Sequence, residues 1–337
     1  MQISKKTDNP FVKIHQSLGA ELTQVDEIIK ASSQGKADLI GKITNHLVFA
    51  GGKRVRPILT LLSSKICNYQ NGHNNLKLAA AVELIHSATL LHDDVVDESN
   101  LRRGKKTANA IWNNKTSILV GDYMLSVAFQ LMVQSESLEV LDILSKTSGI
   151  MADGEVLQLM NSHDIAILEE KYLEIISCKT AILFTASAEI GAVISNADQQ
   201  KQQALADFGN NLGIAFQIID DILDYSATQE NLGKDIGNDF FEGKVTLPII
   251  LTYKQANDDE KAKIKEIFLH NLTNKDKNEK SFAQMMQIMA KYNALELTTK
   301  KAQYFYQLAQ NNLNIFAPSP EKTMLLEILD YAISRQK

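Results

Sequence analysis

An all-α fold is predicted for this chain by three observations. Only five prolines occur, and none lies between Pro57 and Pro248, so long helices can form there without a break. Apolar residues recur with a period of about 3.6 residues along most of the chain. Alternating Val, Ile and Thr runs, which would indicate strands, are lacking. We expect one domain over residues 1–337, a single large helical bundle with loops near 70–75, 271–281 and 317–320.

Composition is that of an ordinary soluble globular protein. The 337 residues are 45% hydrophobic and 22% charged, with a net charge of −5. This charge argues against nucleic acid as a partner, because nucleic-acid binding needs a basic surface. Cys67 and Cys178 are too few for a disulfide framework, so we expect a cytoplasmic protein. No secretory signal and no apolar run of about 18 residues is recognised, so we expect no transmembrane segment.

The first stretch with chemical character is GGKRVRP at 51–57. Its two glycines allow a sharp turn, and Lys53, Arg54 and Arg56 follow directly. Alternate basic positions can converge on one phosphate group. A basic loop at the start of a helix is the competing interpretation.

The next helix, ELIHSATLLHDDVVDES at 83–99, ends in Asp93, Asp94 and Asp97. One helical turn separates Asp93 from Asp97, so both lie on one face. Two carboxylates at this spacing repel each other unless a cation lies between them, and oxygen-only ligands favour Mg²⁺. A solvated acidic helix end is the alternative.

Polar residues flank this triad on both sides. His86 lies two turns before Asp93 on the same face, as a ligand-binding residue or as a satisfied core histidine. Glu83 and His86 also form the E-x-x-H pattern of di-iron bundles, but the sequence lacks the second copy that such a site needs. Arg102 and Arg103 point in different directions, so they either bind two phosphate groups or neutralise the aspartates.

A second aspartate triad favours the metal interpretation of the first. The segment FQIIDDILDYS contains Asp220, Asp221 and Asp224 with the same spacing. Two triads facing each other across a cavity can hold a cluster of Mg²⁺ ions, which suits a diphosphate. Gln217 lies one turn before Asp221 and either orients a ligand or completes a polar network.

Buried polar residues are expected in two further helices. Lys179 and Thr180 interrupt the apolar segment YLEIISCKTAILF, and a buried lysine needs an anionic partner such as a phosphate. Glu155 and Gln158 in GEVLQL are expected to belong to a packing network.

A glycine-broken loop follows the second triad. The segment GKDIGNDFFEGKVTLP at 233–248 contains Lys234 and Lys244. A loop of this kind either closes over bound phosphates or is an ordinary exposed connection.

In this order the motifs resemble those of the trans-isoprenyl diphosphate synthases, the polyprenyl synthetase family. The resemblance covers about residues 40–250 and includes VGDY besides the motifs above. It implies an all-α fold around a deep central cavity and a homodimer. It also implies Mg²⁺-dependent head-to-tail condensation of isopentenyl diphosphate onto an allylic diphosphate such as farnesyl or geranyl diphosphate.

The resemblance also implies a role for each polar residue. It implies that the two triads together hold a cluster of about three Mg²⁺ ions on the allylic diphosphate. The residues of the triads are Asp93, Asp94, Asp97, Asp220, Asp221 and Asp224. These six residues and Lys179 are the implied catalytic residues. Isopentenyl diphosphate is assigned to Lys53, Arg56, His86 and Arg103. The allylic diphosphate is assigned to Arg102, Lys179 and Lys234, with Thr180, Gln217 and Lys244 as further contacts.

Product length in this family depends on the residues four and five positions before the first triad, here Thr89 and Ala88. Both are small, which implies an open tunnel and a medium- or long-chain product. The flanking HDDVVDES resembles octaprenyl-type synthases that make quinone side chains, as in ubiquinone. A shorter geranylgeranyl or farnesyl product is the alternative. So hydrophobic a product also implies transient membrane contact at release.

Three rival functions are weighed against this one. A non-catalytic regulatory subunit typically lacks one triad, whereas both are complete here. A terpene cyclase usually has a different second motif, and a metal-free lipid-binding bundle would not need so many acidic and basic residues. Asn113 and Asn238 depart from the family pattern, where Gly and Asp are common, but neither is an assigned ligand.

Overall fold

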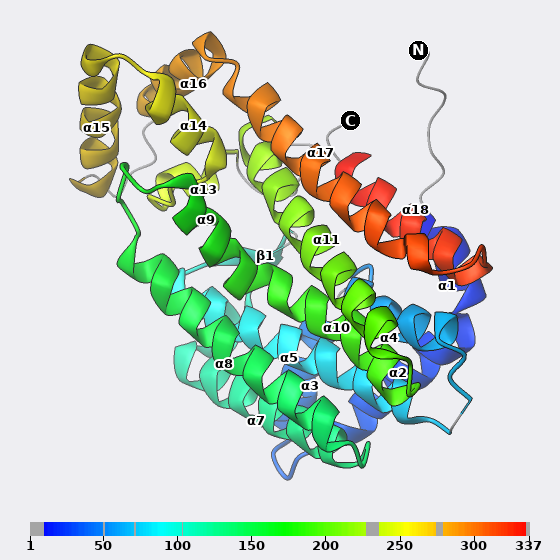
Figure 1. The fold of residues 1–337 in the computed structure, drawn as a ribbon. Helices are drawn as coiled ribbons and strands as arrows, with labels where there is room; N and C mark the ends of the chain where they lie inside the picture. Colours follow the sequence, from blue (N-terminus) through cyan, green and yellow to red (C-terminus); the bar gives the residue numbers. More distant parts are fainter. Residues whose placement is uncertain are drawn as a thin grey trace.

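The computed structural model describes residues 10–49, 51–70, 72–102, 104–226, 236–273 and 279–334. Long helices make up nearly all of this part of the chain (Figure 1), so the all-α prediction is confirmed. Within these ranges, strands are confined to one antiparallel hairpin of β1 (Leu101–Arg102) and β2 (Lys105–Lys106).

The helices of the first half are α1 (Pro10–Ser17), α2 (Gly19–Ser32), α3 (Asp38–Val48), α4 (Val55–Ile66), α5 (Asn74–Val96), α6 (Ala108–Trp112), α7 (Asn114–Val133) and α8 (Leu138–Met160). Those of the second half are α9 (Glu169–Ile176), the π-helical turn η1 (Ser177–Ala181), α10 (Ile182–Ile194), α11 (Gln199–Ser226), α13 (Asn238–Phe241), α14 (Leu247–Gln255), α15 (Asp258–Thr273), α16 (Glu279–Lys291), α17 (Ala294–Asn312), the 3₁₀ turn η2 (Leu313–Ile315) and α18 (Pro320–Ser334).

Helix α5, which bears the first triad, runs through the core. Every residue from Leu78 to Ile85 is buried, as expected for a helix that is apolar on all sides. It packs against α2, α4, α7 and α10. Because the core surrounds its first half, the acidic end of α5 is held at a fixed place.

Helix α11, which bears the second triad, joins two apolar clusters. Its first half packs in the same cluster as α5, and its second half, from Ile214 to Tyr225, packs in a cluster with α9 and α14–α17. Helix α17 lies alongside α11 over much of its length (Figure 1). The aspartates of α11 therefore lie at the end of a helix that is supported on several sides.

Three glycines let helices α8 and α11 approach the π turn η1 and the start of α10. A Cβ atom on Gly154 of α8 would lie 2.7 Å from the backbone N of Lys179. A Cβ on Gly213 of α11 would lie 2.6 Å from Cα of Ala181, and one on Gly209 would lie 2.5 Å from the carbonyl of Phe184. These separations are too short for any larger residue, so η1 is held tightly between two helices.

Some element boundaries differ from the sequence prediction. Helix α5 already begins at Asn74, inside the expected loop, because the side-chain amides of Asn74 and Asn75 donate hydrogen bonds to Ser135 O and Ser64 Oγ. Helix α15 continues to Thr273, also inside an expected loop, and α18 begins directly at Pro320. Polar composition was therefore an incomplete guide to where helices end.

Two segments are long and apolar enough to cross a membrane by length and composition: Asn114–Val133 and Glu169–Ile194. In this fold 44% and 61% of their apolar windows are buried inside the protein. The second segment includes η1, which packs against α8 and α11 as a core element.

Candidate active site

A cleft opens where the triad-bearing ends of α5 and α11 meet. Its inner part has a volume of about 210 Å³ and its outer part about 290 Å³. Both parts are lined by the same five polar residues, so they form one continuous cleft: Asp97, Arg102, Gln217, Asp239 and Lys244. Asp93 and Asp221 line the inner part, and Asp220 and Asp224 line the outer part. The two triads thus meet at one cavity.

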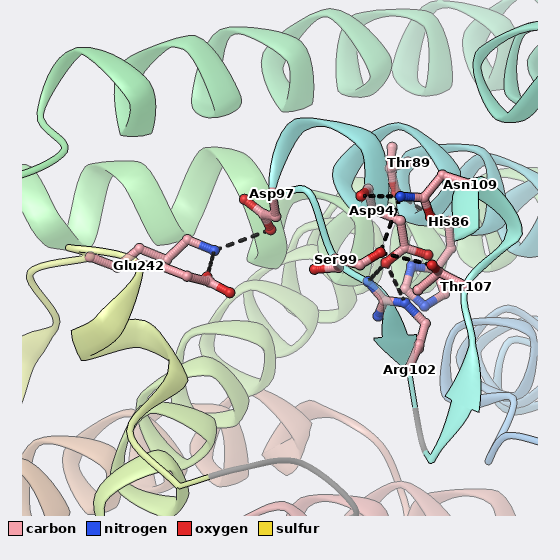
Figure 2. A network of polar contacts seen from close by, with 10 residues as sticks. His86, Thr89, Asp94, Asp97, Ser99, Arg102, Thr107, Asn109 and Glu242 are labelled. Atoms are coloured by element: carbon pink, nitrogen blue, oxygen red, sulfur yellow. Dashed lines mark hydrogen bonds and ion pairs between the residues drawn. The ribbon is translucent and has the colours of Figure 1, made fainter. Parts of the chain in front are cut away.

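The first triad is divided between the cleft and the protein interior. Asp93 and Asp97 line the cleft, whereas Asp94 is only 1% exposed. Arg102 donates two hydrogen bonds to Oδ1 of Asp94, from Nε at 3.0 Å and from Nη2 at 2.8 Å. In Figure 2, Asp97 lies apart from this pair, on the side of Glu242. Arg102 therefore neutralises one aspartate by ion pairing and also contributes to the cleft.

Burial raises the pKa of Asp93 to about 6. The nearby carboxylates of Glu155 and Asp97 raise it further, against the lowering effect of Lys179 and Arg102. The inner cleft is lined by four carboxylates against three cations, Arg102, Lys179 and Lys244, so negative charge is in excess there. This excess, on oxygen ligands only, fits a site for a hard divalent cation.

In the second triad all three aspartates line the cleft, but the middle one is almost completely buried. Asp221 is 2% exposed and accepts hydrogen bonds from the Tyr172 hydroxyl at 2.5 Å and from Gln217 Nε2 at 2.9 Å. Burial raises the pKa of Asp221, as does the charge of Asp239, while these two hydrogen bonds lower it. The side chain of Gln217 in turn accepts a bond from the Thr180 hydroxyl at 3.0 Å. The polar network predicted as one option for Gln217 is therefore present.

Lys179 projects from η1 between α8 and the cleft. Its Nζ lies 2.5 Å from Glu155 Oε2 and 2.5 Å from Gln158 Oε1. The packing network expected for Glu155 and Gln158 is confirmed, and Lys179 is its cationic partner. Because Lys179 also lines the cleft, this pairing leaves it within reach of a bound anion.

Lys244 joins the first triad to the segment after the second. Its Nζ lies 3.1 Å from Asp97 Oδ2 and 2.8 Å from Glu242 Oε2. Burial favours the neutral amine, but the carboxylates of Asp97, Asp239 and Glu242 outweigh it and raise the pKa of Lys244. Lys244 is therefore a permanent positive charge in the cleft.

The basic residues of the segment at 51–57 point in different directions. Arg54 has a left-handed backbone, with φ of 53°, and pairs with Glu83 at 2.7 Å and with Asp26 at 3.0 Å. Glu83 is thereby used in an ion pair, which removes it from the di-iron interpretation. Arg56 instead stacks on the ring of Phe184, with 4.4 Å between the guanidinium carbon and the ring centroid. The two alternate arginines therefore do not converge on one site: Arg54 is used in structural ion pairs, and Arg56 remains a candidate for ligand binding.

Arg56 lies close to the second triad. Burial lowers the pKa of Arg56 to about 10, against the opposing effects of the carboxylates of Glu83 and Asp220. Lys53 is exposed, with Nζ 4.4 Å from the ring centroid of Tyr331 on α18. These two cations approach from the α4 side of the molecule, whereas Arg102, Lys179 and Lys244 line the cleft itself.

Several predicted residues lie outside the cleft lining. Arg103 and Lys234 fall outside the described residues. Among the described ones, the cleft is not lined by Lys53, Arg56, His86, Ala88 or Thr89. His86 accepts a hydrogen bond at its carbonyl from the Thr89 hydroxyl at 2.8 Å, and Ala88 is fully buried in α5.

Two residues of the site were not singled out in the sequence. Tyr172 lies two turns before Lys179 and so shares its face, but an uncharged aromatic residue in an apolar helix resembles core. Asp239 lines both parts of the cleft and follows a glycine whose positive φ begins a short helix. The sequence signal that could have identified Asp239 is its place in the same glycine-broken loop as Lys244.

The chain is similar to known proteins over nearly its whole length. The model of the polyprenyl synthetase family matches residues 37–308. The chain belongs to this family. An octaprenyl diphosphate synthase of Haemophilus influenzae is 36% identical to it over 94% of both chains. An all-trans-nonaprenyl-diphosphate synthase of Rhodobacter capsulatus is 38% identical over 94% of this chain and 95% of that one.

Solved structures of the family have the same fold. A polyprenyl synthase from Caulobacter crescentus, complexed with calcium and isoprenyl diphosphate, superposes with a TM-score of 0.91 at 40% identity, over 99% of this chain and all of that one. The relatives of this family member are prenyl diphosphate synthases that differ in product length. The isoprenoid synthase fold implied by the sequence motifs is thereby confirmed.

Proposed function

We propose that the protein is a trans-polyprenyl diphosphate synthase, a Mg²⁺-dependent prenyltransferase that condenses isopentenyl diphosphate head-to-tail onto an allylic diphosphate. The observation that best supports this is the single cleft that receives aspartates from both triads together with Arg102, Lys179 and Lys244. Carboxylates that bind cations and cations that bind phosphates occur there side by side, which suits a metal diphosphate.

The six aspartates are proposed to serve the metal in two ways. Asp93, Asp97 and Asp220 line the cleft and would hold Mg²⁺ jointly with oxygens of the diphosphate, since Mg²⁺ usually binds one or two carboxylates plus substrate phosphates. Among the described residues, no group of three or more His, Cys, Asp or Glu converges as a preformed metal site. Asp221 and Asp224 also line the cleft, but these two and Asp94 accept hydrogen bonds from protein groups and would hold the ends of α5 and α11 in place.

The basic and polar residues are proposed to bind the two substrates at separate places. The allylic diphosphate would bind in the cleft, where Arg102, Lys179 and Lys244 supply charge and Thr180 and Gln217 supply hydrogen bonds, with Lys234 as a further contact. Isopentenyl diphosphate would bind on the α4 side through Lys53, Arg56, His86 and Arg103. The calcium and isoprenyl diphosphate of the Caulobacter complex support a divalent cation and a diphosphate as ligands in this fold.

The chemistry follows from charge and exclusion of water. When bound, Mg²⁺ would neutralise the departing diphosphate, and Lys179, Arg102 and Lys244 would stabilise the charge that develops as the C–O bond breaks. The double bond of isopentenyl diphosphate then attacks the allylic carbon, and the departing diphosphate accepts the proton that is lost. Ile167, Ile175 and Ile176 line the inner cleft and keep water from the cationic carbon.

Octaprenyl diphosphate, a precursor of quinone side chains such as that of ubiquinone, is the product that we propose. Ala88 and Thr89 lie on α5 just over one turn before Asp93. Neither lines the cleft, but their small side chains would let a growing chain pass beside this helix. Octaprenyl and nonaprenyl synthases among the relatives support a long product. Ala88→Phe should shorten the product by several isoprene units, and an unchanged product would exclude this tunnel.

The assembly is proposed to be a cytoplasmic homodimer in which residues 1–337 form one domain. Large apolar side chains are exposed on α7 and α8, which pack against each other; they include Leu119 at 67%, Leu138 at 83% and Met160 at 77% exposure. A partner subunit would cover these side chains. Release of a long product would bring the dimer into transient contact with a membrane.

The deciding experiment is mass-resolved product analysis of the purified protein with farnesyl diphosphate, labelled isopentenyl diphosphate and Mg²⁺. The expected result is a ladder that ends in one dominant long product. A single addition would keep the reaction but exclude the long-chain proposal. No incorporation, with activity restored by a separate synthase subunit, would instead support a regulatory subunit.

A further inference from the structure

Asp224, the last aspartate of the second triad, is bonded to the backbone of α13. Its carboxylate accepts a hydrogen bond from the amide of Asn238 at Oδ1, 3.1 Å, and one from the amide of Asp239 at Oδ2, 3.0 Å. Its carbonyl accepts a third bond, from the amide of Gly237 at 2.8 Å. Three consecutive amides at the start of α13 are therefore satisfied by one residue of α11.

These amides have no partner within their own helix, because the first N–H groups of a helix point away from it. A carboxylate is the best acceptor for them, since hydrogen bonds to a charged acceptor are stronger than neutral ones. Asp224 thus does for α13 what an N-cap residue does for an ordinary helix, although it lies 14 positions before Asn238.

The opposite side of α13 is fixed by aromatic packing. Phe240 is fully buried, with its ring centroid 5.4 Å from that of Phe268 and 5.5 Å from that of Phe282. Gly237 has a φ of +77°, and Phe282 packs so closely there that a Cβ would lie 2.5 Å from its ring. With Asp224 on one side and this cluster on the other, α13 has one orientation.

The orientation of α13 determines where the charged groups of the cleft lie. Asp239 lines both parts of the cleft, and its carbonyl accepts a hydrogen bond from the amide of Lys244 at 2.8 Å. Lys244 in turn reaches Asp97 at 3.1 Å. A continuous series of contacts therefore leads from the second triad, through α13, to the first triad.

We propose that Asp224 is a positioning residue: it holds α13 so that Asp239 and Lys244 face Asp97, and its carboxylate is used by the backbone of α13 rather than by a metal ion. The role of the cleft in this assignment rests on the proposed function. The contacts of Asp224 with α13 do not depend on any reaction. It separates Asp224 from Asp220, four positions earlier on the same helix: both line the outer cleft, but the carboxylate of Asp224 accepts hydrogen bonds from two amides of α13.

The first test is amide hydrogen exchange of the metal-free, substrate-free protein. Asp224→Ala should raise the exchange rate of the amides of Asn238 and Asp239 at least about tenfold, the loss expected for roughly 1.4 kcal/mol of protection, whereas the amide of Gly237 keeps its backbone acceptor. Asp224→Asn keeps one acceptor oxygen and should give an intermediate rate, whereas Asp220→Asn should leave these amides as in the wild type. Wild-type protection in Asp224→Ala would overturn the proposal.

The second test is the Mg²⁺ dependence of the steady-state rate in the variants that keep an amide side chain. Asp220→Asn should raise the Mg²⁺ concentration for half-maximal rate. Asp224→Asn should leave it unchanged and raise KM for the allylic diphosphate about tenfold through displaced Lys244. An equal Mg²⁺ shift in both variants would make Asp224 a metal ligand and overturn the proposal.

Wild-type inactivity would refute the proposed function alone, and the exchange test would still decide the role of Asp224.

Discussion

Lys244 Nζ lies 3.1 Å from Asp97 Oδ2, although the two residues are 147 positions apart in the chain. This ion pair joins the end of α5 to the segment that follows α13. It balances a carboxylate of the cleft with a lysine whose pKa is raised by the acidic groups around it, although burial acts in the opposite direction. The first triad is therefore linked electrostatically to the segment after the second triad before any ligand binds.

Replacement of Lys244 by Met should strongly reduce activity. The change keeps the length of the side chain but leaves Asp97 and Glu242 without their shared cation. We expect kcat/KM to fall about 10- to 100-fold, the effect of roughly 1.4–2.8 kcal/mol. Lys254→Met is the matched control, because its side chain is 70% exposed and lies 3.8 Å from its nearest carboxylate. Equal losses in both variants would contradict a specific role for Lys244.

Replacement of Tyr172 by Phe should destabilise the protein. The buried carboxylate of Asp221 would lose its hydroxyl donor, which costs about 1.5–3 kcal/mol for a charged acceptor. Tyr225→Phe provides the comparison, because it removes the acceptor of a neutral hydrogen bond that the Thr246 hydroxyl donates at 3.2 Å, worth about 0.5–1.5 kcal/mol. Urea denaturation measures both. The prediction fails if Tyr225→Phe is the more damaging change.

Gly154 and Gly149 of α8 form a second matched pair. An alanine at Gly154 would place Cβ 2.7 Å from the backbone N of Lys179 and 2.8 Å from Cβ of Cys178, so η1 must shift. We expect a loss of about 1–3 kcal/mol in the free energy of unfolding, together with lower activity through Lys179. Gly149 has nothing within 4 Å, so alanine there should stabilise the helix by about 0.5–1 kcal/mol. Thermal denaturation of both variants tests the contrast.

The raised pKa of Asp93 predicts a pH-dependent stability. Because its folded-state pKa of about 6 lies above that of an unfolded aspartate, about 3.9, the folded protein holds this proton more tightly. The contribution stabilises the fold below about pH 4 and is lost as the pH rises through about 6. Asp93→Asn removes the titration, so its stability relative to the wild type should rise by about 2 kcal/mol between about pH 4.5 and 7.5.

Urea titrations at several pH values with a chelator present measure this difference. The control is Asp258→Asn, at an exposed position in the first turn of α15. A constant stability difference between Asp93→Asn and the wild type across this range would show that Asp93 is not held in a buried, acidic environment.

The helices and the two triads could be predicted because their signals are local. Apolar periodicity and the absence of proline indicate helices directly, and the spacing of Asp93 and Asp97 places both on one face of α5. Both aspartates do line the cleft. The ion pair between Asp94 and Arg102 is one of the two interpretations that the sequence allowed for this arginine.

Other parts of the site depend on contacts between distant segments. The bond from Tyr172 to Asp221 joins α9 to α11, and no local pattern marks Tyr172 as different from a core residue. The bonds from Asp224 to α13 follow from the path of the chain after α11, which the D-D-x-x-D pattern does not encode. The spacing of the sequence identified the acidic residues, but it could not show which of them accept hydrogen bonds from other parts of the protein.

The π turn η1 interrupts the regular α-helical geometry between α9 and α10, and it determines the direction of the side chains within it. It contains one residue more per turn than an α-helix, and this extra residue lies just where Lys179 and Thr180 enter the cleft. Deleting a single residue from 177–181 would allow one unbroken α-helix from α9 through α10. Because the bulge takes up this residue within the turn, the helices on either side would keep their orientation, but side chains inside the turn would be redirected. Lys179 would turn away from Glu155, or Thr180 away from Gln217. A shorter and locally more regular chain would thus no longer present Lys179 to the cleft, so this segment should tolerate changes of length less well than an ordinary surface loop.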